Sequence, residues 1–224
     1  MEALSINGLV MPTDFPRDLY EAVQNKLNRF QKQYGHDYFI GAWSAISYRY
    51  HAVVDHDDDF TASLIKHGPG LGQPLRYHQE RNLFGFFSNG VSVLDAYCFA
   101  MFAVGAILIP SNFSLVDEWK IDWKFTSIAY KSSFPGDPMP AVLDKLWVDP
   151  AYVDLREIRN VLTHRGVPPR HHSLPIGSDA KPTAILGRVN IALDKETTSS
   201  RRQQVVRLLS TALEATWSFV EAHC

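Results

Sequence analysis

The amino-acid sequence predicts an all-α protein: a helical bundle of four to five main helices in a single domain that covers residues 1–224. Two observations support this prediction. Apolar residues recur at helical spacing along most of the chain, whereas the alternation typical of a strand is confined to one short stretch. Several such helices with so little strand pattern indicate a bundle. Irregular, loop-rich insertions are expected at about residues 54–73 and 166–198, the second with one short strand or hairpin.

The first two helices are predicted from their ends and their apolar faces. Asp14 is suited to cap the first helix, Pro16 is acceptable in its first turn, and Gly35 ends it. A second helix is expected at about residues 37–51, with one apolar face made of Phe39, Trp43, Ile46 and Tyr50.

The segment that follows is predicted to be rich in loops. An acidic run occupies residues 55–59 and a glycine-rich run occupies residues 68–72. A short helix at about residues 60–66 fits between them, with Asp59 as its cap. The acidic run has side chains that bind metals, but its spacing matches no ligand pattern and such runs are usually solvated. We therefore expect no metal site and no cofactor.

The longest predicted helix covers residues 77–108 and ends before Pro110. Its apolar stretch, residues 91–109, is about as long as the ~20 residues that span a bilayer. Asp95 lies inside this stretch, and a helix that is apolar nearly all round also suits the centre of a soluble bundle. The buried helix is the favoured interpretation, so no membrane contact is expected.

The remaining elements follow from breaks in the chain. Helical turns are expected within residues 113–134, a loop at 134–138 and a short helix at 140–146. A further helix opens at Asp149 and Pro150 and is closed by Gly166. A short strand is expected at residues 184–193, and the last helix at 199–222.

Overall composition limits the kinds of function. The chain is 46% hydrophobic and 21% charged, as in an ordinary soluble globular protein. Its net charge is −2 and its pI is about 6.5, so any contact with nucleic acid must come from a local basic patch. Cys98 and Cys224 form no disulfide framework, and the N-terminal residues show no secretory pattern, so a cytoplasmic location is expected.

The helix that opens at Pro150 carries the most informative polar residues. Its apolar stripe, made of Ala151, Leu155, Ile158 and Leu162, is expected to face the core. Asn160 and His164 are four residues apart on the opposite face, and Arg159 lies on the flank between the two faces. The alternative is an ordinary solvated face whose final histidine favours the helix dipole.

A basic cluster surrounds this helix end. Between residues 156 and 172 the only acid is Glu157, and the basic side chains are Arg156, Arg159, His164, Arg165, Arg170, His171 and His172. Arginine forks bind phosphates, and histidine exchanges protons near neutral pH. We therefore expect Arg156, Arg165, Arg170, His171 and His172 to bind the phosphates of RNA.

The string Arg159-Asn160-Val161-Leu162-Thr163-His164, on a late helix and before a loop, resembles the R-N-x-x-x-H motif of the HEPN superfamily. The resemblance implies a HEPN-like helical bundle. Active HEPN proteins are mostly metal-independent endoribonucleases that work as homodimers, with the two motif helices facing each other. By this resemblance, Arg159 would neutralise the scissile phosphate, His164 would transfer a proton or position the ribose 2′-hydroxyl, and Asn160 would orient one of them.

HEPN proteins also tend to carry a polar residue on an earlier core helix, near the motif. Ser88, Ser92 and Asp95 are spaced for one face of the long helix, and Ser92 and Asp95 are the candidates for supporting residues. A buried aspartate requires a partner, and Arg159 is the expected one. Alternatively, this pair locks the bundle without a catalytic role.

Two functions remain open at the level of sequence. The first is a dimeric endoribonuclease or RNase-like RNA binder, of the kind found in toxin–antitoxin or defence systems, with a protein antitoxin as a candidate partner. The second is a catalytically inactive HEPN-like scaffold that binds a nucleotide or a protein. The near-neutral pI favours the second, because free RNA is held largely through its phosphates.

Overall fold

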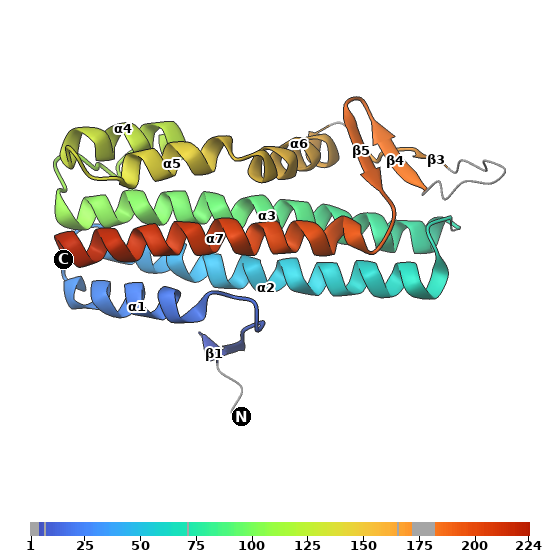
Figure 1. Cartoon of the computed structure of the whole chain (residues 1–224), viewed down its shortest axis with the longest axis horizontal. Helices are drawn as coiled ribbons and strands as arrows, with labels where there is room; N and C mark the ends of the chain where they lie inside the picture. The colour runs from blue at the N-terminus through green and yellow to red at the C-terminus, as the bar shows by residue number, and fades with distance from the viewer. Residues whose placement is uncertain (1–4, 7, 71, 165, 172–181) are drawn as a thin grey trace.

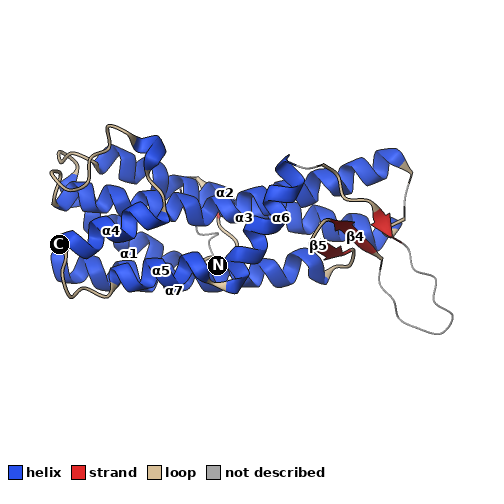
Figure 2. Cartoon of the chain, turned by 90° about the horizontal axis from the view of Figure 1, so that it is seen from above, coloured by secondary structure: helices blue, strands red, loops and turns tan. Residues whose placement is uncertain are grey.

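The structure, a computed structural model, describes residues 5–6, 8–70, 72–164, 166–171 and 182–224. Long helices run side by side along the molecule, and a small antiparallel sheet lies at one end (Figure 1). The view from above shows the same arrangement (Figure 2). The predicted all-α class is confirmed, with minor strands added.

The first helix, α1, covers Arg17–Leu27 and continues as a 3-10 turn, Asn28–Phe30. It is shorter than predicted, and the predicted cap at Asp14 is wrong. The Asp14 carboxylate instead accepts a hydrogen bond from Arg202 Nε at 2.8 Å. Gly35 has a φ of +91° and precedes the next helix, where a side chain would collide with Ala103 and Ala106.

The second helix, α2, runs without interruption over His36–His67. The predicted end at residue 51 is therefore wrong, and the segment predicted to be loop-rich, residues 54–73 with a short helix at 60–66, is continuous helix up to residue 67. The apolar face continues through the acidic run because Val53, Phe60 and Leu64 are buried. Asp57 lies on that face and pairs with Arg202 at 3.5 Å, while Asp59 is exposed within the helix and caps nothing.

The third helix, α3, covers Gln73–Leu108 and packs antiparallel against α2 (Figure 1). It is long and apolar enough to cross a membrane, but 78% of its most apolar 18-residue window is buried inside the protein. Tyr97 of α3 donates a hydrogen bond to the Ala212 carbonyl of α7, Glu196–His223, at 3.1 Å. The core position of α3 is compatible with a soluble protein.

Three shorter helices lie on one side of the long helices (Figure 1), where the first and third contact α3 and the second contacts α7. They follow a 3-10 turn, Glu118–Lys120, and their bounds are Trp123–Ser133 for α4, Met139–Val148 for α5 and Pro150–His164 for α6. Asp122 caps α4 by accepting a hydrogen bond from the Phe125 N–H at 2.7 Å. Both α6 and α5 also contact α7, so the motif helix packs on two long core helices, α3 and α7.

The strands form two small antiparallel sheets. β1, Ser5–Ile6, pairs with β2, Leu9–Val10. The second sheet contains β3, Arg170–His171; β4, Thr183–Leu186; and β5, Val189–Ala192. β4 lies between the other two. The predicted strand at 184–193 is thus the β4–β5 hairpin, which turns at Gly187 with a φ of +62°. This sheet lies where α6 ends and α7 begins (Figure 1).

Candidate functional site

The motif helix α6 presents the two faces that the sequence predicts. Its buried residues include Ala151, Leu155 and Ile158, and Leu162 is partly buried against the core. Asn160 and His164 are exposed. Neither side chain makes a hydrogen bond or ion pair with another residue that the structure describes. Both are therefore available to a molecule outside this chain.

The start of α6 is fixed by Asp149. Its carboxylate accepts hydrogen bonds from the Ala151 N–H at 2.9 Å and from Arg207 at 2.8 Å. Partial burial alone would raise the pKa of Asp149, but the hydrogen bonds from Arg207 and Ala151 lower it below its ordinary value. The carboxylate therefore stays charged at the positive end of the helix dipole.

Arg159 lies partly buried on the flank of α6, and its Nε atom is buried without a hydrogen-bond partner. The predicted pairing of Arg159 with Asp95 is wrong. Asp95 Oδ1 accepts hydrogen bonds from the Tyr152 hydroxyl at 2.5 Å and from Trp123 Nε1 at 3.3 Å. Tyr152 is two helical turns, about 10.5 Å, before Arg159 along α6, so the arginine lies at a different level of the bundle from Asp95.

Asp95 is also exposed rather than buried, so the expected burial of its charge does not occur. Burial, with the nearby Asp95 carboxylate, raises the pKa of the Tyr152 hydroxyl, which therefore remains protonated and donates. The other predicted supporting residue, Ser92, is half-buried, and its backbone carbonyl accepts a hydrogen bond from Arg49 at 3.1 Å. These contacts join α2, α3, α4 and α6 near the start of α6.

Asp95 and Arg49 border a groove of about 590 Å³ between α2 and α3. Its other lining residues are mainly small or aromatic and include Gly41, Ala45 and Phe99. The candidate supporting residue thus opens onto this groove on one side and contacts the motif helix through Tyr152 on the other.

Arg156 stacks on an aromatic surface. Its guanidinium carbon is 3.6 Å from the centroid of the Trp147 ring and 5.0 Å from that of Tyr152. Stacking of this kind occupies the face of the guanidinium and leaves the donors at its edge available. Arg156 is therefore held in place but still able to bind a phosphate.

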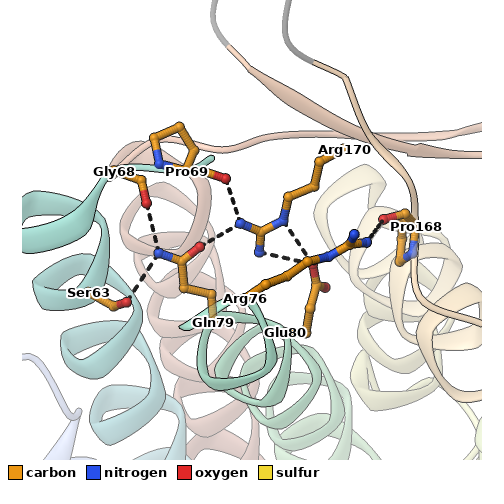
Figure 3. Close-up of polar contacts among 8 residues, drawn as sticks. All are labelled: Ser63, Gly68, Pro69, Arg76, Gln79, Glu80, Pro168 and Arg170. Carbon is orange, nitrogen blue, oxygen red and sulfur yellow. Dashed lines mark hydrogen bonds and ion pairs between the residues drawn. The ribbon is translucent and has the colours of Figure 1, made fainter. Parts of the chain in front are cut away.

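Arg170 has a structural role that its sequence context does not reveal (Figure 3). Its side chain is only 5% exposed and pairs with Glu80 at 2.9 Å. It also donates to Gln79 Oε1 at 2.6 Å and to the Pro69 carbonyl at 2.7 Å. The prediction that Arg170 binds RNA phosphate is therefore wrong, because its donors are used inside the protein.

Gln79 extends this arrangement by donating to Ser63 Oγ at 3.1 Å and to the Gly68 carbonyl at 3.0 Å (Figure 3). Arg76 donates to the Pro168 carbonyl at 3.1 Å. We call the set of Arg76, Gln79, Glu80 and Arg170 the clasp. It ties the segment after α6 to the turn between α2 and α3.

The rest of the predicted basic patch is only partly described. His171 is exposed on β3. Arg165 and His172 lie outside the described residues. Arg159, Asn160 and His164 come together on the last turns of α6, whereas Arg156 lies one turn earlier and Arg170 lies in the clasp.

A pocket that the sequence does not predict lies between α6 and the β4–β5 hairpin. Its volume is about 460 Å³, and its lining residues are Glu157, Asn160, Val161, Gly187, Arg188 and Val189. We call it the hairpin pocket. The single strand predicted at residues 184–193 runs through the turn of the hairpin, so neither the turn nor the pocket beside it is predicted. The Gly187-Arg188 pair is the one feature of the sequence that indicates this turn.

Within the described ranges, no group of three or more His, Cys, Asp or Glu side chains is arranged to hold a metal ion. Comparisons with protein-family models, with curated proteins and with solved structures gave no significant match. The functional conclusion therefore depends on the geometry of the site and on the motif.

Proposed function

We propose that this protein is a HEPN-type, metal-independent endoribonuclease that acts as a homodimer through α6. The observation that carries the proposal is the placement of Asn160 and His164, one turn apart, exposed and without a partner among the described residues. The helix that bears them is well packed, and rigid placement of this kind suits catalysis.

The proposed reaction uses the RNA's own 2′-hydroxyl. His164 accepts the 2′-hydroxyl proton, the 2′-oxygen bonds to phosphorus, and the bond from phosphorus to the 5′-oxygen breaks. The products are a 2′,3′-cyclic phosphate and a 5′-hydroxyl, which takes up the proton. Arg159 offsets the extra negative charge on the phosphate oxygens during the reaction, and Asn160 orients the phosphate or His164.

The geometry of α6 supports a dimer. At about 100° per residue, Arg159 and His164 are separated by about 140° around the helix axis. A phosphate between them within one chain would have to lie across the Asn160 crest of the helix. If two α6 helices faced each other about a two-fold axis, the arginine flank of one protomer would approach the histidine face of the other.

A second candidate function is a non-catalytic scaffold that binds a nucleotide or a protein, such as an antitoxin. The observation that favours it is that Arg170 pairs inside the protein and so cannot bind RNA, in a chain whose net charge is −2. Fewer free cations bind fewer RNA phosphates.

Cleavage of a mixed RNA pool in EDTA distinguishes the two functions. The wild-type protein is expected to cleave and to leave 2′,3′-cyclic phosphate ends. His164→Ala and Arg159→Ala should each lower the rate by about 100-fold or more, as the loss of a proton-transfer group or a charge-stabilising group does.

Matched controls lie at the other end of the bundle. His223 is in the last turn of α7 and Arg29 is in the 3-10 turn after α1, so His223→Ala and Arg29→Ala should cleave at the wild-type rate. A wild-type protein that does not cleave RNA with or without EDTA would overturn the ribonuclease proposal and leave the scaffold.

A further inference from the structure

The hairpin pocket adjoins the proposed catalytic residues. Glu157, Asn160 and His164 are spaced i, i+3 and i+7, so they follow one line along α6. The pocket lies beside the first two of these residues, on the side of the helix away from Arg159. A molecule bound there would lie next to the position of the scissile phosphate.

The polar side chains of the pocket have no partner among the residues that the structure describes. Glu157, Asn160 and Arg188 are all exposed. None of them makes a hydrogen bond or an ion pair with another residue in the described part of the chain. A carboxylate, an amide and a guanidinium thus border one cavity, where their hydrogen-bonding groups are free.

The β4–β5 hairpin forms the opposite wall of the pocket, and Arg188 belongs to it. Val189 and Ile191 of β5 and Ala184 of β4 are buried, which anchors both strands on the bundle. The turn at Gly187 then places Arg188 at the tip, across the pocket from α6. Val161 and Val189 provide the apolar part of the lining.

This combination has a specific chemical complement. A carboxylate accepts hydrogen bonds only, and guanine is the RNA base whose Watson–Crick edge carries two adjacent kinds of donor, N1–H and N2–H₂. A single-stranded base can present this edge to a protein. A guanidinium binds a phosphate through two parallel hydrogen bonds. The cavity volume lies within the about 300–1,000 Å³ typical of small-ligand sites.

We propose that the hairpin pocket binds a guanosine nucleotide of the RNA next to the scissile phosphate, with Glu157 at the base edge and Arg188 on a backbone phosphate. This inference rests on the proposed ribonuclease function. It makes Glu157 a specificity-determining residue, and it gives the β4–β5 hairpin a role in holding substrate.

Nucleotide binding tests the pocket independently of cleavage. Titration calorimetry of the full chain with 5′-GMP, 5′-AMP, 5′-CMP and 5′-UMP should show that GMP binds about tenfold more tightly than the others. Glu157→Gln should remove this preference, and Arg188→Ala should lower the affinity for all four nucleotides. Glu221→Gln, on the exposed surface of α7, and Asn190→Ala, an exposed residue of β5 outside the pocket, are the matched controls.

Mapping of cleavage sites in the RNA pool supplies the second measurement. Cuts next to guanosine that spread to other bases in Glu157→Gln support the inference. A preference for GMP without any RNA cleavage would support guanosine binding in the hairpin pocket and contradict the proposed ribonuclease function. Suppose that the wild type cleaves RNA with no base preference and that Arg188→Ala is as active as the wild type. This result would overturn guanosine binding in the hairpin pocket and leave the ribonuclease proposal intact. Equal affinity for the four nucleotides would also overturn guanosine binding there. Circular dichroism of each variant confirms that it is folded.

Discussion

At the scale of single residues, Asp95 has different partners from the one that the sequence predicts. The spacing of Ser88, Ser92 and Asp95 identifies a polar face on a helix that is otherwise apolar. It cannot show which side chain from another helix arrives opposite that face. Tyr152 and Trp123 reach Asp95 because α6 and α4 pack against α3 at that level.

A double-mutant cycle tests this pairing. Removal of the carboxylate by Asp95→Ala leaves the buried Tyr152 hydroxyl without its acceptor and should lower the free energy of unfolding by about 1–3 kcal/mol. We expect coupling between Asp95→Ala and Tyr152→Phe, and coupling between Asp95→Ala and Arg159→Ala below about 0.5 kcal/mol. Urea unfolding of the single and double variants gives both values. Strong coupling to Arg159 would contradict the assignment.

Asp57 carries a second prediction at this scale. Burial raises its pKa above the ordinary 3.8, although hydrogen bonds and the charge of Arg202 oppose the shift. The folded state therefore holds the Asp57 proton to higher pH than the unfolded state. The contribution of this group is most favourable at low pH and declines as the pH rises above 3.8 through the raised pKa.

The measurement is the difference in free energy of unfolding between the wild type and Asp57→Asn, followed with pH. As the pH rises from about 4, the stability of the wild type should fall relative to that of the variant. The same comparison with Asp58→Asn, whose side chain is 74% exposed, serves as the control. A shift in the opposite direction would show that the pairing with Arg202 outweighs burial.

At the scale of elements, apolar periodicity predicts the helices well where polar residues mark their ends. Pro150 and Gly166 bracket α6, and its buried and exposed faces are as predicted. Periodicity is less useful in α2, where acids interrupt the pattern. Asp57 occupies a buried position there because Arg202, 145 residues later in the chain, pairs with it, and local sequence does not reveal that contact.

The clasp has a measurable contribution to stability. Arg170→Ala would remove the principal partner of the Glu80 carboxylate. The Glu80 side chain is only 11% exposed, so water cannot replace that partner fully. The loss of one member of a buried pair typically costs about 3–5 kcal/mol. Arg170→Lys should recover only part of this, because an ammonium cannot make the branched contacts to Gln79, Glu80 and Pro69.

Thermal or urea unfolding measures the effect of these Arg170 variants. Arg207→Ala is the control, since this arginine is 54% exposed and its loss should be much milder. An Arg170→Ala variant as stable as Arg207→Ala would show that the clasp contributes little.

At the scale of the whole molecule, the charge balance predicts how RNA is held. The chain has 22 Lys and Arg residues against 24 Asp and Glu residues, so there is no general excess of positive charge, and the local arginines of the site are expected to hold the RNA. Each phosphate contact with single-stranded RNA contributes about 0.7 to the slope of log affinity against log salt. If Arg156, Arg159 and Arg188 each bind one phosphate, the slope per protomer should be about −2.

Fluorescence anisotropy with a labelled single-stranded RNA, measured across salt concentrations on the inactive His164→Ala variant, gives this slope. Arg188→Ala added to that variant should make the slope shallower by about 0.7. Arg29→Ala is the control. A slope near zero would mean that phosphates are not the groups recognised, which favours the protein-binding scaffold.

The overall bundle could be predicted from the sequence because a helix records its buried face locally. The site could be predicted only in part. Its motif lies on one helix, but the hairpin pocket, the clasp and the contacts of Asp95 each join segments far apart in the chain. Such contacts depend on the packing of whole elements, so one sequence without relatives does not specify them.

The clasp also has a consequence for the order of assembly. Arg170 meets Glu80 and Gln79 across 90 and 91 residues, so the segment after His164 is secured only when the α2–α3 hairpin is in place. Long closures of this kind are costly before the intervening chain has condensed. On the proposed function, a newly made or partly unfolded chain would lack a secured active site, and RNA cleavage would begin only after the bundle has formed.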